Sequence, residues 1–401
     1  MNLPPGADIP ARRRPVRDIG SPGGAGGNGE PICGHRRTVT SRTVGIEEEL
    51  LLVEPGTGRP RAVAGTVLSA AGHAAGSDLE SELQQQQLET NSRLCHTLDD
   101  LHRELRRCRA SAAAAAGRAG AHVAALGTSP VPVQPRPAEK SRYQRMAEAF
   151  GLTAQEQLTC GYHIHVEVAS DDEGVAVLDR IGPWMAALLA LSANSPFWQG
   201  RDSSYASFRY QAWGRWPSSG PTGPFGTAQA YHDVVRQMVE TGTILDTGMI
   251  YFDARLSESY PTIEIRVADV CLRTDDAVLI AALARALVET EARAWREGTP
   301  APRPRTELLR LAAWRASRSG LDDALLDPVT GLPERATAVA AMLLDHCRDA
   351  LADAGEADAA TELLTALLAR GNGAACQRAA YRQSGDLSAV ISSAVAVTGT
   401  G

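Results

Sequence analysis

The segment Thr43-Val44-Gly45-Ile46-Glu47-Glu48-Glu49-Leu50-Leu51-Leu52-Val53 decides how this sequence is interpreted. Its apolar and β-branched residues are typical of a buried strand. Carboxylates inside such a strand are costly unless a cation or a donor compensates their charge. Because side chains alternate along a strand, Glu47 and Glu49 share one face and Glu48 points to the other. The pair forms half of a site for a hard cation such as Mg2+, although a solvated edge strand explains this segment equally well.

The composition allows a large core and excludes several classes of protein. The chain has 401 residues, of which 44% are apolar, enough for one large domain or two ordinary ones. A net charge of -7 argues against nucleic-acid binding. No uncharged apolar stretch is long enough to span a membrane, and 181–191 is predicted to be a buried helix. The seven cysteines include no CxxC pair, which favours free thiols and a cytoplasmic location.

The sequence divides into three parts. Residues 1–40 are rich in Gly, Pro and Arg and are predicted to be a disordered arm. Residues 41–390 are predicted to form a single catalytic domain with a helical C-terminal part, and 391–401 a tail. Strand patterns fall in the first two-thirds of the chain and helical patterns at the end. This order predicts an α+β fold with a largely antiparallel sheet and helices on one face. The predicted strands are 43–53, 161–168, 249–256 and 262–268, and a helix is predicted from Thr97 to about Gly127.

Each predicted strand has one apolar face and one face of charged or imidazole side chains. Carboxylates and imidazoles suit metal ions, and Arg suits phosphate or carboxylate. A surface that binds both a cation and an anion is what a nucleotide–metal site requires. The sequence has no P-loop motif, and the His163-x-His165 pair is a weak signal by itself. The polar faces carry Glu47, Glu49, His163, His165, Glu167, Asp253, Arg255, Glu264 and Arg266, with no Lys.

Several longer motifs, in order, resemble the carboxylate-amine ligase family related to glutamate-cysteine ligase type 2. The resemblance covers about residues 42–388. It implies a glutamine-synthetase-like fold, in which an antiparallel sheet lines an active-site funnel and helices pack on the outer face. It also implies that ATP and Mg2+ are used. The matching segments are 43–50, 160–166, 191–202, 205–217, 251–256 and 261–269, followed by 369–374 and 377–380.

The resemblance implies a set of metal ligands. Glu47 and Glu49 match the family's Glu-x-Glu on the first strand, and Glu264 matches the Glu of a Glu-x-Arg strand. The family has a further acidic pair spaced seven positions apart, and Glu82 and Glu89 have that spacing. All five residues are therefore candidate metal ligands, whereas Glu48 is predicted to bind no Mg2+.

The resemblance also implies residues that contact the nucleotide. His163 matches the His of a Gly-x-His strand and is expected near the metal or phosphate. Arg266 is expected on phosphate. Arg209, in the aromatic loop, is expected on a substrate carboxylate or the γ-phosphate. Both arginines are candidate catalytic residues.

The implied activity is ATP-dependent ligation of a carboxylate to an amine through an acyl phosphate. For this type the resemblance implies a weak ligation of glutamate to cysteine. The expected partners are amino acids and ATP, with no nucleic acid and no membrane. A homodimer is compatible with the sequence, which does not determine the oligomeric state. A metal-dependent amide hydrolase and a catalytically silent relative of the same fold are the alternatives.

Overall fold

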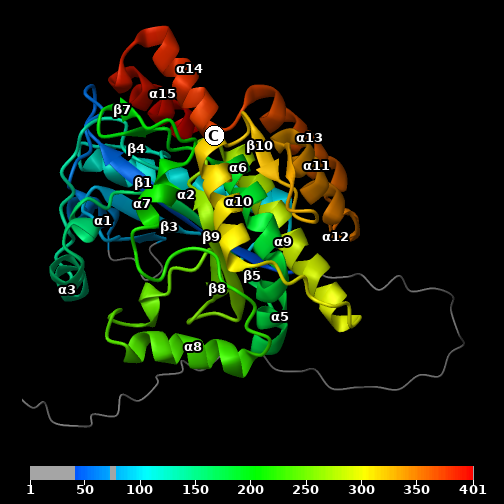
Figure 1. The fold of residues 1–401 in the computed structure, drawn as a ribbon. Coiled ribbons are helices and arrows are strands. Elements are labelled where there is room, and N and C mark those ends of the chain that lie inside the picture. The colour runs from blue at the N-terminus through cyan, green and yellow to red at the C-terminus, as the bar shows by residue number, and fades with distance from the viewer. Residues whose placement is uncertain (1–40, 73–77, 401) are drawn as a thin grey trace, which may run out of the picture. The chain divides into compact units, whose positions relative to one another are not determined.

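An antiparallel sheet organises the fold, and β1 lies near its centre (Figure 1). The computed structural model describes residues 41–72 and 78–400, so the predicted arm of 1–40 lies outside the described residues. The sheet has seven strands, in the order β2-β3-β1-β5-β9-β8, with β4 also paired to β1. The strands are β1 (Val44–Val53), β2 (Leu79–Glu80), β3 (Gln87–Asn91), β4 (His122–Ala124), β5 (Gly161–Glu167), β8 (Ala254–Leu256) and β9 (Thr262–Asp269).

The register of the sheet aligns the polar residues of neighbouring strands. Glu47 of β1 lies opposite His163 of β5, and His165 lies opposite Glu264 of β9. Directly opposed residues project to the same face of a sheet. Three strands that are distant in sequence therefore contribute to one polar surface, as the alternation predicts.

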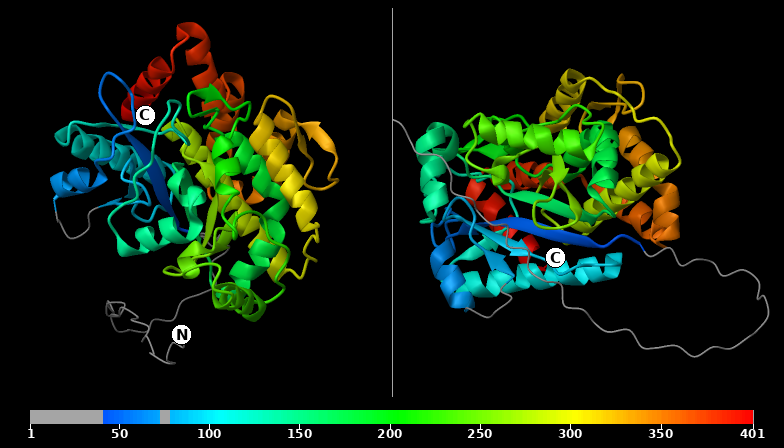
Figure 2. Two further views of the ribbon diagram at one scale, coloured as in Figure 1. Left: turned by 60° about the vertical axis from the view of Figure 1, so that its left-hand side comes forward. Right: turned by 90° about the horizontal axis from the view of Figure 1, so that it is seen from below.

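The other face of the sheet is apolar and is covered by helices. Ile46, Ile164 and Ile265 are almost fully buried there, in one core cluster with residues of α5 (Asp171–Ile181), α6 (Met185–Ser192) and α9 (Thr274–Arg296). The right-hand view of Figure 2 shows β1 in blue beside α2 in cyan. These observations confirm the predicted α+β class.

Helix α2 (Leu98–Arg118) begins as its sequence predicts and ends earlier. The Thr97 side chain accepts a hydrogen bond from the backbone N–H of Asp100, which is an N-cap. Asp99 and Asp100 then lie in the first turn, near the positive end of the helix dipole. The prediction of a helix to about Gly127 is wrong, because the chain turns at Gly120, which has a φ of 68°, and continues as β4.

One helical segment of the core is notably apolar. Asp171–Ser192, which includes α5 and α6, is long and apolar enough to cross a membrane, but 78% of that window is buried inside the protein. The segment 181–191 is thus buried, as predicted. The remaining elements are α1 (Ala64–Ala71), α3 (Ser141–Phe150), α4 (Leu152–Gln155), η1 (Gly182–Trp184), β6 (Phe197–Trp198), β7 (Arg201–Asp202), α7 (Phe208–Trp213), α8 (Ala228–Glu240), η2 (Thr247–Met249), α10 (Thr306–Ser319), β10 (Ala324–Leu326), β11 (Pro333–Arg335), α11 (Ala336–His346), α12 (Arg348–Asp353), α13 (Ala357–Arg370), α14 (Gly373–Ser384) and α15 (Leu387–Thr400).

Two predicted boundaries differ from the structure. The predicted strand at 249–256 is a strand only over Ala254–Leu256, because backbone N–H groups before it bond to the loop at 218–220. The predicted domain boundary at residue 390 falls inside α15. Ile391 and Ala394 of that helix are buried in the same cluster as β1 and α2 residues, so burial of an apolar helix face continues the fold past the boundary.

Glu48 makes a buried ion pair on the apolar side of β1. Its two carboxylate oxygens accept hydrogen bonds of 3.0 and 2.7 Å from Arg109 of α2. Arg109 also donates to the carbonyls of Cys271 and Leu272. The side chains of Glu48 and Arg109 are 0% and 1% exposed. Glu48 therefore ties β1 to α2, away from the polar face.

We expect Glu48→Gln to destabilise the protein by about 3–5 kcal/mol, because it leaves the charge of Arg109 buried without its partner. Urea unfolding followed by circular dichroism measures this change. Glu297→Gln, at an exposed glutamate after α9, is the matched control and should change stability by less than about 0.5 kcal/mol. Equal stability of the two variants would contradict a structural role for Glu48.

Candidate active site

The polar face of the sheet forms one wall of a cavity of about 260 Å³. Strands β1, β3, β5 and β9 contribute acidic and basic side chains to it. Trp213, Trp216 and Tyr251 line another part of the cavity, and their rings pack against one another with centroids 4.7–6.3 Å apart. The cavity therefore combines a strongly charged part with an aromatic part.

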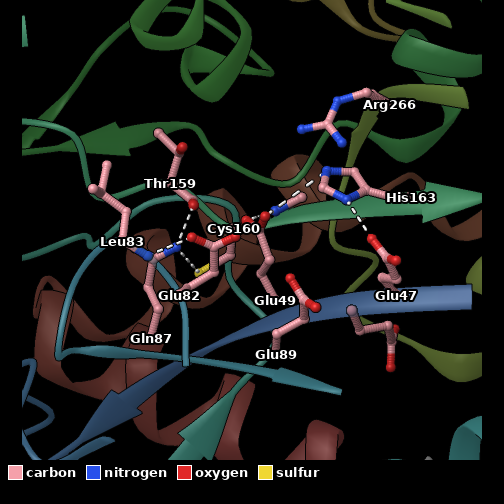
Figure 3. A network of polar contacts seen from close by, with 12 residues as sticks. Glu47, Glu49, Glu82, Leu83, Gln87, Glu89, Thr159, Cys160, His163 and Arg266 are labelled. Atoms are coloured by element: carbon pink, nitrogen blue, oxygen red, sulfur yellow. Dashed lines mark hydrogen bonds and ion pairs between the residues drawn. The ribbon is translucent and has the colours of Figure 1, made fainter. Parts of the chain in front are cut away.

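One acidic group comprises Glu49, Glu82 and Glu89, which Figure 3 shows with their carboxylates directed toward one another. One carboxylate oxygen from each lies within 4.8 Å of the others. Glu49 is opposite Glu89 in the β1–β3 register, and Glu82 comes from the loop before β3. Neither Glu82 nor Glu89 forms an ion pair with an arginine or lysine of the described residues.

Burial and mutual repulsion weaken ionisation in this group. Burial, and then the charge of Glu82, raise the pKa of Glu49 to about 7. Burial and the charge of Glu47 raise the pKa of Glu89 well above its usual value, and the pKa of Glu82 is also raised, mainly by burial. One buried and two partly buried carboxylates, none of them paired with an arginine or lysine of the described residues, fit a hard divalent ion. On this observation, the residues present suit Mg2+.

A second group comprises Glu47, His165 and Glu264, whose ligand atoms also lie within 4.8 Å of one another. Glu47 is 3.1 Å from Nδ1 of His163 and 3.2 Å from Nε2 of His165. Burial raises the pKa of Glu47, but hydrogen bonds from His163 and His165 outweigh burial and leave the pKa well below its usual value. Glu47 is therefore a carboxylate at neutral pH.

His163 lies between the two acidic groups. Burial and the positive charge of Arg266 lower the pKa of His163 to about 4, so the imidazole is neutral at physiological pH. Its Nδ1 faces Glu47, and its Nε2 lies 3.8 Å from Glu49 without a hydrogen-bond partner. A neutral imidazole that donates from Nδ1 keeps the Nε2 lone pair available to a cation.

Two arginines hold Glu264 and line the same cavity. Arg255 Nε lies 2.7 Å from one carboxylate oxygen of Glu264, and Arg266 forms an ion pair with the other. Burial raises the pKa of Glu264, but the two arginines outweigh burial and leave it well below its usual value. A register irregularity between β5 and β9 lies beside Arg266, and such irregularities re-aim side chains. The Arg266 guanidinium lies over the rings of Trp213 and Tyr251, 5.9 Å from each centroid.

The position of Arg209 differs from the sequence expectation. Its side chain is 2% exposed and does not line the cavity. It donates to the backbone carbonyls of Arg266 and Val267 and lies 3.9 Å from Asp269. The carbonyls of β9 and the buried carboxylate of Asp269 fix the guanidinium beside Gly161, on the same face of the sheet as His163 but outside the cavity lining. We therefore revise Arg209 from a substrate contact to a residue that positions β9 beside the cavity.

Gly161 is required by this packing. A Cβ atom at Gly161 would lie 2.3 Å from Nη2 of Arg209 and 3.1 Å from Nε2 of His163. The backbone N–H of Gly161 also donates to Glu49 over 2.7 Å. A side chain here would displace the residues that surround Glu49.

Most of the candidate site residues converge on the cavity, whereas other polar residues of the strands do not. His165 joins Glu47 and Glu264 in a possible ligand group, whereas the resemblance implied a role near the metal or phosphate for His163 only. The His-x-His alternation was the signal that could have included His165. Glu167 accepts hydrogen bonds from Thr43, and Asp253 accepts one from Tyr210, both outside the cavity. The candidates that line the cavity are Glu47, Glu49, Glu82, Glu89, His163, Glu264 and Arg266.

Sequence comparison identifies the family. Residues 43–393 match Glutamate-cysteine ligase family 2 (GCS2). The chain belongs to this family. A Streptomyces avermitilis protein named "Putative glutamate--cysteine ligase 2-1" is 55% identical over 359 residues, which cover 89% of this chain and 99% of the relative. A Streptomyces coelicolor protein named "Putative glutamate--cysteine ligase 2" is 52% identical over 356 residues, covering 88% of this chain and 98% of the relative.

Solved structures share the fold at low sequence identity. A glutamate–cysteine ligase from Francisella tularensis, in complex with AMP, has a TM-score of 0.64 and 14% identity over 90% of this chain and 89% of that chain. A bifunctional glutathione synthetase from Pasteurella multocida has a TM-score of 0.65 and 14% identity over 90% of this chain and 53% of that chain. The family and the fold together make this protein an enzyme of the ATP-dependent carboxylate-amine ligases.

We expect divalent cations to bind more tightly as pH rises to about 7. With a pKa of about 7, Glu49 is protonated at lower pH and must lose a proton to coordinate a cation. The apparent affinity for Mn2+ should rise at least about tenfold per pH unit between pH 5.5 and 7, because the pKa values of Glu82 and Glu89 are also raised. Titration calorimetry in two buffers of different ionisation enthalpy measures both affinity and proton release.

His163 should contribute no released proton above pH 5, because its pKa of about 4 leaves it neutral. Glu297→Gln should leave the pH profile unchanged, since that exposed glutamate lies outside the cavity. An affinity that does not vary between pH 5.5 and 7.5 would show that cations bind elsewhere.

Proposed function

We propose that this enzyme activates the side-chain carboxylate of glutamate with ATP and joins it to an amine, with weak glutamate–cysteine ligase activity. The observation that carries the proposal is that two groups of metal-ligand side chains and two arginines face one cavity. Cation sites beside arginines match a substrate with a polyphosphate chain. The homologous proteins of Streptomyces support the same assignment by their names.

Two sets of residues would hold Mg2+. Glu49, Glu82 and Glu89 would provide one set, and Glu47 and Glu264 the second, with an imidazole nitrogen from His163 or His165. Bound Mg2+ would neutralise charge on the phosphate oxygens of ATP. The raised pKa values of Glu49, Glu82 and Glu89 support the first set, and the grouping of Glu47, His165 and Glu264 supports the second.

The arginines would bind and orient the phosphates. Arg266 and Arg255 already lie beside Glu264 and line the cavity. Arg266 presents a planar guanidinium held over Trp213 and Tyr251, so its direction is set before a ligand arrives. Preorganised donors of this kind stabilise the charge that develops on a transferred phosphoryl group.

The proposed reaction has two steps. An oxygen of the glutamate side-chain carboxylate attacks the γ-phosphorus of ATP, the bond to the bridging oxygen breaks, and ADP leaves. A neutral amine then attacks the acyl carbon, phosphate leaves with the bonding electrons, and the amine loses a proton as the amide forms. The buried aromatic wall of Trp216 and Tyr251 would limit access of water to the acyl phosphate.

The features of the cavity favour a ligase over the two alternatives. An amide hydrolase needs a metal-activated water but no pair of arginines for phosphate. A silent relative would have no reason to keep three adjacent, at least partly buried carboxylates whose pKa values are raised. We propose amino acids and ATP as the small-molecule partners, a cytoplasmic location and a homodimer as the assembly to test first.

We expect ADP formation that depends on glutamate and increases when cysteine or another amine is added. Glu47→Gln should reduce the rate at least about 100-fold, because one cation would lose a ligand and its charge compensation. Glu297→Gln is the matched control and should retain the wild-type rate. A coupled ADP assay with pairs of amino acids, followed by mass analysis of the product, makes the measurement.

Other results would decide against the ligase. Amide hydrolysis without ATP would establish the hydrolase, and the absence of ADP with every pair would favour the silent relative. Wild-type ATP turnover by Glu47→Gln would show that Glu47 is not a metal ligand.

A further inference from the structure

The hairpin between β8 and β9 forms one rim of the cavity. Ser257, Ser259 and Tyr260 of its turn line the cavity, beside Arg255 of β8. The turn is held by hydrogen bonds from Ser257 N–H to the Thr262 carbonyl and from Thr262 N–H to the Tyr260 carbonyl, 2.9 and 2.8 Å long. The backbone that carries Tyr260 is therefore fixed on the β9 side of the turn.

Tyr260 differs from the other aromatic residues of the cavity. Tyr260 is 63% exposed, whereas Trp216 and Tyr251 are 2% and 6% exposed. Trp213, Trp216 and Tyr251 use their rings to pack against one another. The Tyr260 ring contacts the ring of His165, with the two centroids 6.0 Å apart and the ring planes nearly perpendicular. Much of the Tyr260 ring therefore remains available to a ligand.

The Tyr260 ring lies beside the charged groups of the cavity. His165, which it contacts edge-on, lies in the group with Glu47 and Glu264 and bonds through Nδ1 to Thr262. Arg255 and Arg266 bind Glu264 in that same region. An aromatic platform thus adjoins a place suited to a cation and a phosphate chain. A ligand that carries both a planar base and phosphates would use the two features together.

We propose that Tyr260 stacks on the adenine of ATP, with the phosphates directed toward Arg255, Arg266 and Glu264. This inference rests on the proposed function, and it also assigns the orientation of ATP in the cavity. The base would lie at the β8–β9 hairpin, and the aromatic wall of Trp213 and Trp216 would remain for the amino-acid substrates. Stacking uses the aromatic ring and not the hydroxyl, so we expect Tyr260→Phe to preserve the interaction.

The test compares ATP with inorganic tripolyphosphate, which has the phosphates but no base. In the full-length protein with Mg2+, Tyr260→Ala should raise the Kd of ATP about tenfold or more. The Kd of tripolyphosphate should change less than twofold, and Tyr260→Phe should bind both ligands like the wild type. Tyr381→Ala, at a tyrosine of α14 that is 38% exposed and outside the cavity, is the matched control. Calorimetry measures binding, and circular dichroism confirms the folded state.

The outcomes separate this inference from the proposed function. Unchanged ATP affinity in Tyr260→Ala, with normal wild-type binding, would overturn the stacking role and leave the ligase assignment standing. An equal loss of ATP and tripolyphosphate affinity would also overturn it, because the effect would then not involve the base. A wild-type protein that binds neither ligand would overturn both proposals.

Discussion

The crowding of negative charge on one face of β1 is the constraint on which the site depends. Glu47 and Glu49 share that face with Glu82, Glu89 and Glu264 at the wall of one cavity. Arg255, Arg266 and the histidines compensate Glu47 and Glu264, whose pKa values are lowered as a result. Glu49, Glu82 and Glu89 form no ion pair with an arginine or lysine of the described residues, and their pKa values are raised. A protein that concentrates buried carboxylates in this way needs cations to ionise them, and the cations in turn attract a phosphate chain.

The sheet separates this charge from the structural core. Glu48 is adjacent in sequence to both cavity glutamates, yet it points to the helices and pairs with Arg109. The alternation of a strand therefore assigns neighbouring glutamates to different tasks. A second set of buried polar contacts supports β9, where Arg209 donates to the Arg266 carbonyl and lies 3.9 Å from Asp269. Ion pairs outside the cavity lining thus support the strands that carry the cavity residues.

The parts of the fold and site that follow from alternation could be predicted from the sequence. Strand β1, the His-x-His of β5 and the Glu-x-Arg of β9 each have a two-residue period, which indicates both a strand and the direction of its side chains. The contribution of Glu82 came from the family resemblance, since it lies in a loop with no periodicity.

Features that depend on tertiary packing could not be predicted in this way. The family resemblance placed Arg209 on a substrate carboxylate or the γ-phosphate, but Asp269, which is distant in sequence and buried, lies beside it outside the cavity lining. The position of His165 beside Glu264 depends on how β5 and β9 pair. The burial of α15 depends on contact with the cluster beneath β1, which no local pattern reveals. In each case the deciding partner lies far away along the chain.

An anomalous difference map from crystals grown with Mn2+ at pH 7.5 tests the central claim most directly. Mn2+ replaces Mg2+ at oxygen-rich sites and scatters anomalously. The account predicts one peak among Glu49, Glu82 and Glu89, and a second beside Glu47 and Glu264, with no peak at Glu48. A cavity without peaks, or a peak bound to Glu48, would contradict it.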